Sequence, residues 1–124
     1  MHSHIDARAI LPFMKSILNN QGFLDPKSGK SLDSPPNAFS DHLRIEHWHL
    51  SGLYGFNIPF LREYSKQRPE VLIELIDITK SNQRAIDAHI TAFPTTKVFV
   101  NGIEVGSTSV VIVTKEWLDG LLNF

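Results

Sequence analysis

The chain has 124 residues, of which 42% are hydrophobic and 20% are charged, and its 12 basic and 13 acidic residues give a net charge of -1. These values predict a single domain over residues 1–124 with its own hydrophobic core. Near-neutral charge supplies no long-range attraction, so neither nucleic acid nor a membrane surface is expected as a partner. No apolar run reaches the length of a membrane span, and the first ten residues lack the pattern of a signal peptide, which predicts a cytoplasmic location.

The amino-terminal segment predicts a helix followed by a long surface loop. Between residues 6 and 21, four apolar residues recur at helical spacing: Ile10, Met14, Ile17 and Leu18. Gly22 stands where such a helix would end, and Pro12 marks a kink or a later start. Residues 24–41 are rich in Pro, Ser, Asp and Gly and show neither helical nor strand periodicity, which predicts a surface loop.

The middle of the chain predicts a strand, a helix and a second strand. Residues 43–50 (LRIEHWHL) have the pattern of a strand. The helix expected over residues 57–67 has one apolar side, made by Phe60, Leu61 and Tyr64. Residues 70–78 (EVLIELIDI) are almost continuously apolar and branched, which is typical of a central strand that is covered on both faces.

A third helix and a hairpin are predicted next. Ser81 can cap this helix, which would carry Ala85, Ile86 and His89 toward the segment that begins at Thr91. Residues 96–100 (TKVFV) predict a strand, and Asn101 and Gly102 tolerate the positive φ angles of a tight turn. The strand that returns from this turn is expected to run from residue 103 to about 113.

Thr114 is expected to cap a last helix with one apolar face, formed by Trp117, Leu118, Leu121 and Leu122. The charged segment 79–84 (TKSNQR) is interpreted as a solvated helix face. The predicted order of elements is α, β, α, β, α, β, β, α, which favours an α/β sandwich around a mixed sheet.

Several of these segments resemble thioredoxin-like proteins. Residues 92–106 (AFPTTKVFVNGIEVG) and 114–122 (TKEWLDGLL) are similar to the carboxy-terminal half of that family, and residues 70–90 are similar to the strand and helix before it. The resemblance covers residues 43–124. It implies a thioredoxin-like α/β/α sandwich with a central mixed sheet, preceded by the helix and loop of residues 1–42.

The resemblance fails at the redox chemistry of the family. Counting back from Pro94 places residues 51–60 (SGLYGFNIPF) where the family carries its Cys-Gly-Pro-Cys turn and a helix kinked by proline, here Pro59. The two reactive positions hold Ser51 and Tyr54, and the chain contains no cysteine, so it cannot form or exchange a disulfide. No cofactor is implied. The start of the following helix keeps N–H groups that could hold an anion.

The proline turn carries the expectation of a binding surface. In the family, the residue that matches Pro94 has a cis peptide bond, and the backbone before it pairs with an extended peptide. The resemblance also implies that Phe93 and Pro94 lie beside Leu53 and Tyr54. The expected partner-binding residues are Ser51, Gly52, Leu53, Tyr54, Phe93 and Pro94.

The resulting hypothesis is a redox-inactive protein-binding module, acting as an adaptor, assembly factor or chaperone-like protein. Residues 75–95 are also similar to KaiB-type proteins, which work by protein association. One alternative is a thiol oxidoreductase or glutathione-dependent enzyme in which a laboratory serine replaces a cysteine at position 51. Residues 110–113 (VVIV) could form an internal strand or an edge that makes a homodimer.

Histidines give a further alternative, a metal carrier. His47 and His49 are two residues apart on a predicted strand and therefore share one face, with His42 nearby and Glu46 pointing away. The sequence places no third or fourth ligand, so a polar strand end is the favoured interpretation. Trp48, between the two histidines, is expected in the core.

Overall fold

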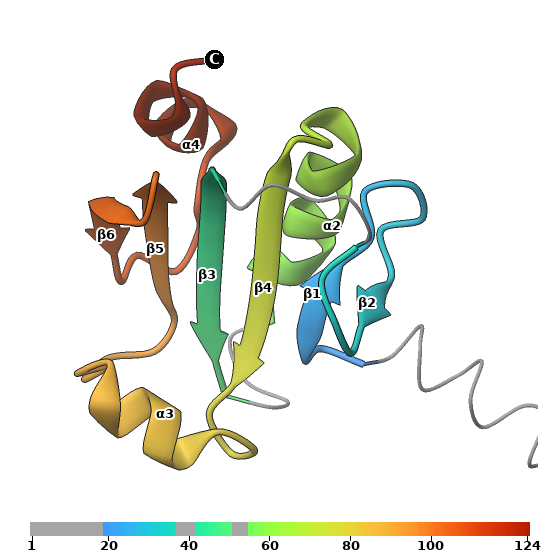
Figure 1. The fold of residues 1–124 in the computed structure, drawn as a ribbon. Coiled ribbons are helices and arrows are strands. Elements are labelled where there is room, and N and C mark those ends of the chain that lie inside the picture. Colours follow the sequence, from blue (N-terminus) through green and yellow to red (C-terminus); the bar gives the residue numbers. More distant parts are fainter. Residues whose placement is uncertain (1–18, 37–41, 51–54) are drawn as a thin grey trace, which may run out of the picture.

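A computed structural model describes residues 19–36, 42–50 and 55–124 of the chain (Figure 1). Its elements in chain order are β1 (Gly22–Leu24), β2 (Ser31–Leu32), β3 (Leu43–His49), α2 (Asn57–Gln67), β4 (Val71–Asp77), α3 (Asn82–Asp87), β5 (Thr95–Val100), β6 (Ile103–Thr108) and α4 (Lys115–Leu122). None of the helices within these residues is long and apolar enough to cross a lipid bilayer.

The six strands form one mixed sheet in the order β2-β1-β4-β3-β5-β6. Strands β3 and β4 are parallel and align Ile45 with Ile73, whereas the other neighbouring pairs are antiparallel. All seven residues of β4 are buried. The prediction of a central strand covered on both faces is therefore confirmed, because only such a strand can bury consecutive branched residues.

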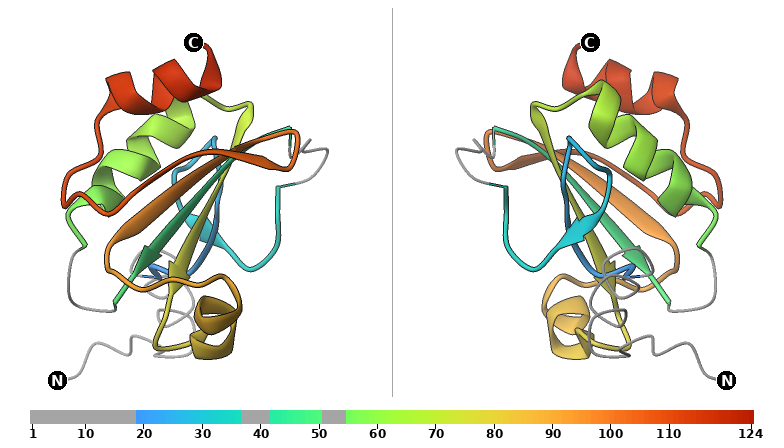
Figure 2. Two further views of the ribbon diagram at one scale, coloured as in Figure 1. Left: turned by 90° about the vertical axis from the view of Figure 1, so that its left-hand side faces the viewer. Right: turned by 90° about the vertical axis from the view of Figure 1, so that its right-hand side faces the viewer.

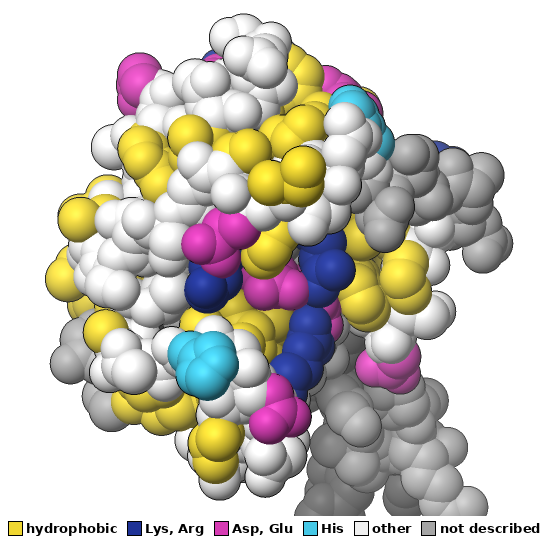
Figure 3. Space-filling model, turned by 60° about the vertical axis from the view of Figure 1, so that its left-hand side comes forward, with side chains coloured by type: hydrophobic (Ala, Val, Ile, Leu, Met, Phe, Trp, Pro, Cys, Tyr) yellow, Lys and Arg dark blue, Asp and Glu magenta, His cyan; other side chains and the backbone are white. Residues whose placement is uncertain are grey.

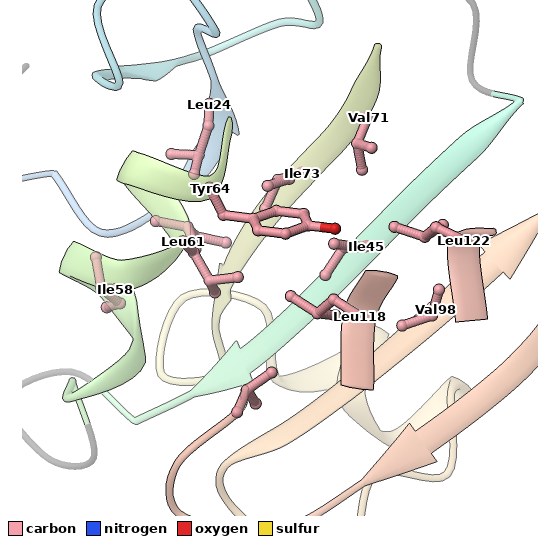
Figure 4. Packing of buried hydrophobic residues seen from close by; sticks show 12 residues of the cluster. Leu24, Ile45, Ile58, Leu61, Tyr64, Val71, Ile73, Val98, Leu118 and Leu122 are labelled. Atoms are coloured by element: carbon pink, nitrogen blue, oxygen red, sulfur yellow. The ribbon is translucent and has the colours of Figure 1, made fainter. Parts of the chain in front are cut away.

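Helices cover both faces of the sheet, as the side views in Figure 2 show. The main core lies between the sheet and the pair α2 and α4 (Figure 4), with Ile45 and Ile73 meeting Leu61 and Leu118. A smaller cluster lies under α3 on the opposite face and contains Trp48, Ile76 and Ala85. The fold is thus the expected α/β/α sandwich, and the prediction that Trp48 belongs to the core is confirmed.

Local signals explain why several elements match their predictions closely. Helix α2 coincides with the predicted range 57–67, and Pro59 lies in its first turn, where a missing N–H removes no intrahelical bond. Asn101 and Gly102 have φ angles of 52° and 79°, as a tight hairpin turn requires. Thr114 accepts a hydrogen bond from the backbone N–H of Trp117 and so caps α4. Ser81 precedes α3 as predicted, but its side chain makes no capping bond.

The loop predicted over residues 24–41 is wrong in part, because β1 and β2 form a short antiparallel hairpin that adds to the edge of β4. Gly22 does not end a helix. It begins β1 with φ of 116°, and an added Cβ would lie 2.3 Å from the carbonyl oxygen of Leu32. The helix predicted from residue 6 lies mostly outside the described residues, and residues 19–21 are not helical.

The returning strand is shorter than predicted, since β6 ends at Thr108 and not near residue 113. Strand pairing does not hold residues 109–113. Side chains make the hydrogen bonds of this segment instead. The hydroxyl of Thr108 accepts from the N–H of Val110, and the side chain of Asn57 bonds the backbone of Val111 and Val113. Branched residues favour a strand locally, but here a polar side chain takes the place of a neighbouring strand.

Candidate functional site

The turn predicted to bind a partner, Ser51, Gly52, Leu53 and Tyr54, lies outside the described residues. Its described flanks are Leu50, which directly follows β3, and the exposed pair Gly55 and Phe56, which leads into α2. The expected contact of Phe93 and Pro94 with Leu53 and Tyr54 stays a prediction. The described part of the candidate site consists of the Phe93–Pro94 turn and residues 109–113, after β6.

The second predicted part of the site is the turn before β5. The Phe93–Pro94 peptide bond is cis, as the resemblance implies. Pro94 is buried, Phe93 is half-buried and Ala92 is exposed. The hydroxyl of Thr95 donates to the carbonyl oxygen of Ala92 at 2.7 Å and accepts from the hydroxyl of Ser109 at 3.0 Å, since it has one proton to give. The turn is thereby joined to the segment that follows β6.

Asn57 joins the other end of that segment to helix α2. Its side-chain N–H donates to the carbonyl oxygen of Val111 at 2.7 Å, and its side-chain oxygen accepts from the N–H of Val113 at 2.9 Å. Asn57 is almost fully buried, so both ends of its amide need protein partners. Residues 109–113 consequently run from the Pro94 turn to the first turn of α2.

This segment presents an unusual amount of apolar surface. The exposed fractions are 54% for Val110, 49% for Val111, 69% for Ile112 and 68% for Phe56, which precedes Asn57 in the chain. We call these four residues the apolar strip. Val110 and Ile112 also line a pocket of about 190 Å³ that reaches Trp117 of α4. Adjacent exposed apolar side chains on a folded protein commonly mark a contact surface.

Acidic and basic side chains gather beside α3, on the face of the sheet that points away from α2 and α4 (Figure 3). Arg84 donates to both carboxylate oxygens of Glu74 at 2.6 and 2.7 Å, and Arg44 contacts both Glu74 and Glu46. The indole N–H of Trp48 also donates to Glu46. Glu46 and Glu74 are buried, and their arginine partners compensate their charge. We call Arg44, Glu46, Glu74 and Arg84 the charge quartet.

The expectation that residues 79–84 form a solvated helix face is therefore wrong for Arg84, which ties α3 to the sheet. Hydrogen bonding to Glu74 raises the pKa of Arg84 above its usual value. The sequence contains a signal for the quartet, because Glu46 and Glu74 interrupt apolar strands and occupy the same register position. That register becomes visible only when the strands pair.

Two of the three candidate metal-binding histidines do share one face, as predicted. The rings of His47 and His49 stack with centroids 6.1 Å apart, and both are buried. His47 bonds the hydroxyl of Thr96 through Nδ1 at 2.8 Å, while His49 donates from Nε2 to the carbonyl oxygen of Asn20 at 2.6 Å. Burial, and secondarily the neighbouring His49, lower the pKa of His47 from 6.5 to about 3.

His42 does not join this pair. It lies just before the opposite end of β3, where its ring contacts the side chain of Asn101. It lies five positions before His47 in extended chain, a span of roughly 16 Å. Within residues 19–36, 42–50 and 55–124, no group of three or more histidine, aspartate or glutamate side chains could hold a metal ion.

Sequence comparisons give no match, either to a family model or to a curated protein. Solved structures do match. Mitochondrial thioredoxin 3 of Saccharomyces cerevisiae, in its oxidized form, is 16% identical, with 68% of this chain and 81% of that one covered and a TM-score of 0.56. Thioredoxin of Fasciola hepatica is 20% identical, with 68% and 82% covered and a TM-score of 0.58.

Oxidised thioredoxin of Plasmodium falciparum is 23% identical, with 64% of this chain and 81% of that one covered and a TM-score of 0.57. Likeness at these identities establishes the fold and not the activity. The predicted similarity to KaiB-type proteins is not among these findings and stays a prediction. The chain therefore has the thioredoxin-like fold, in a sequence that contains no cysteine.

Proposed function

We propose that the chain is a redox-inactive protein-binding module of the cytoplasm, serving as an adaptor, assembly factor or chaperone-like protein. The observation that carries this proposal is the apolar strip beside the Phe93–Pro94 turn. A chain without cysteine has no thiolate with which to attack a disulfide, so binding remains as a use for this surface.

The strip has the chemistry of a protein contact. Its four side chains are uncharged, and about half to two thirds of each is exposed, so burying that exposed part would contribute about 1–2 kcal/mol per side chain to a complex. Asn57 and Ser109 hold the backbone beneath the strip at both ends, which reduces the entropy lost on binding. The adjoining pocket of about 190 Å³ offers a recess for one apolar side chain of the partner.

The turn at residues 51–54 is proposed to complete this surface. It directly precedes Gly55 and Phe56, so it lies next to one end of the strip in the chain. Ser51, Gly52, Leu53 and Tyr54 would then contact the same partner as Phe93 and Pro94.

The test compares two matched variants, Ile112→Asp in the strip and Ile86→Asp on α3. Both residues are well exposed, at 69% and 58%, and both changes replace an apolar side chain by a carboxylate. Tagged wild type and both variants are used to capture proteins from the source cell, after thermal unfolding has shown that all three are equally folded. We expect Ile112→Asp to lower recovery of a specific partner at least tenfold, because an interface would bury an unpaired charge.

Captured proteins are then purified, and their dissociation constants for the three forms are measured by titration. Loss of affinity in Ile112→Asp with normal affinity in Ile86→Asp supports the proposal. Equal behaviour of the two variants would remove the strip as a binding surface. Leu53→Asp, measured in the same way, tests whether the turn at residues 51–54 belongs to the same contact.

A further inference from the structure

A second pocket, of about 320 Å³, lies between the turn that joins β1 to β2 and the outer side of helix α2. Its lining includes Gly29, Lys30, Pro59, Arg62, Glu63 and Lys66. This volume is at the lower end of the range for small-molecule pockets, about 300–1,000 Å³. Strands β4 and β3 separate the β1–β2 hairpin from β5, so the pocket is distinct from the apolar strip and the Phe93–Pro94 turn.

The turn lies directly on the helix at Gly29. Its φ angle is 74°, and its N–H donates to the carbonyl oxygen of Asp25 at 2.6 Å. Its own carbonyl oxygen accepts from the guanidinium of Arg62 at 2.8 Å. A Cβ at this position would lie 3.0 Å from Cε of Lys66, so the glycine permits the close approach that forms the pocket wall.

Arg62 is a half-buried cation whose hydrogen-bond partners are all neutral. Besides Gly29, it donates to the carbonyl oxygen of Asn19 at 2.7 Å and to the side-chain oxygen of Asn20 at 3.2 Å. None of the described carboxylates pairs with it, and burial lowers its pKa. A guanidinium has five N–H donors, and its Nε–H donates to none of the described residues.

The rest of the lining adds positive charge. Lys66 is 3.5 Å from a carboxylate oxygen of Glu63, and both side chains are substantially exposed, so this ion pair is weak. Arg62 and Lys66 therefore face the pocket with one carboxylate, Glu63. This concentration of positive charge occurs in a chain whose net charge is -1.

We infer that this pocket binds a small phosphorylated molecule, with Arg62 and Lys66 directed to its phosphate group. A phosphate monoester carries nearly two negative charges at neutral pH, so it can supply the negatively charged partner that Arg62 lacks among the described residues. Guanidinium and ammonium groups are the side chains that bind phosphate oxygens, and partial burial of Arg62 strengthens that attraction. Pro59 offers an apolar wall for the remainder of the molecule.

The test titrates the chain with glucose 6-phosphate and with inorganic pyrophosphate, following backbone amide signals by NMR spectroscopy at low, constant ionic strength. Glucose alone is the neutral control, and sodium chloride at matched ionic strength is the control for screening. We expect saturable shifts confined to the β1–β2 turn and helix α2, with both phosphorylated probes and with neither control.

Two variants should change the affinity in opposite directions. Lys66→Gln is expected to raise the dissociation constant about two- to fivefold, the effect of one partly exposed charge, and Glu63→Gln to lower it by a similar factor. Lys80→Gln removes an exposed lysine that does not line the pocket and should change nothing. Arg62 is left intact, because it also holds the hairpin to α2.

Several outcomes would overturn the inference. Shifts scattered over the surface, shifts reproduced by sodium chloride, or equal responses of Lys66→Gln and Lys80→Gln would each show screening and not a site. An unchanged dissociation constant in Glu63→Gln would also contradict the charge arrangement. None of these results depends on whether the apolar strip binds a protein.

Discussion

The two faces of the sheet are built from alternate residues of the same strands, but different interactions stabilise them. Toward α2 and α4, β3 and β4 present Ile45 and Ile73. His47 and His49 are buried on the same face, and burial lowers the pKa of His47. Toward α3, the same strands present Arg44, Glu46 and Glu74, which form the charge quartet with Arg84 of α3. Helix α3 has only six residues and covers little area, which leaves room for these charged side chains beside it.

Three measurements would break or sharpen this contrast. The largest effect is expected for Ile73→Ala, on the face covered by α2 and α4. Ile73 is fully buried, and truncation leaves a cavity that the packed helices cannot fill, so the free energy of unfolding should fall by about 3–4 kcal/mol. Chemical denaturation measures this change. Ile103→Ala, at an exposed position on β6, is the control and should cost less than about 0.5 kcal/mol.

A smaller but distinctive loss is expected on the other face from Glu74→Gln. The change keeps the shape of the side chain but leaves Arg44 and Arg84 facing one carboxylate instead of two. Both arginines are partly exposed, which moderates the loss to about 2 kcal/mol. Glu104→Gln, which breaks the exposed pair with Lys97, is the control. Equal stability losses in the two variants would mean that the quartet is no more than a surface ion pair.

The third measurement uses pH to separate the two faces. Because the folded state holds His47 neutral down to about pH 3 while the unfolded chain takes up a proton near pH 6.5, stability is complete above pH 6.5 and falls as the pH decreases toward 3. The expected slope is about 1.4 kcal/mol per pH unit, which His47→Leu should remove. His89→Asn removes an exposed histidine at a positive φ angle that asparagine tolerates, and it should retain the slope.

If His47→Leu and wild type lose stability in parallel on acidification, carboxylates govern the response instead. Asp119 would then be the first carboxylate to test, since its hydrogen bond with Arg68 lowers its pKa below the usual value.

The elements with a strong period were predictable from the sequence. Strands β3, β4 and β5 and helices α2 and α4 carry apolar residues at strand or helix spacing, and tertiary packing agrees with that local preference. The hairpin of β1 and β2 carries no such signal, because its strands have three and two residues and depend on pairing with β4. Such long-range support is invisible in a local pattern.

The candidate site was predictable only in part. The Pro94 turn follows from the resemblance, whereas residues 110–113 predict a strand or a dimer edge. These residues have strand-forming side chains, yet Asn57, more than fifty residues away in the chain, makes the backbone hydrogen bonds of Val111 and Val113. The sequence gives no signal for the pocket beside Gly29, because its charged residues come from two separate segments, the β1–β2 turn and α2. Gly29 and Arg62 join these segments in the fold.

The side-chain amide of Asn57 ties residues 111–113 to the first turn of helix α2. The Asn57 side chain bonds the backbone of both Val111 and Val113, and Asn57 is the first residue of α2. A displacement of residues 111–113 would therefore break these hydrogen bonds or move Asn57. A partner that binds at Ile112 would therefore also stabilise the first turn of α2. Conversely, stabilising that turn would favour the backbone conformation that the partner binds. The carboxamide of Asn57 thus couples residues 111–113 to helix α2.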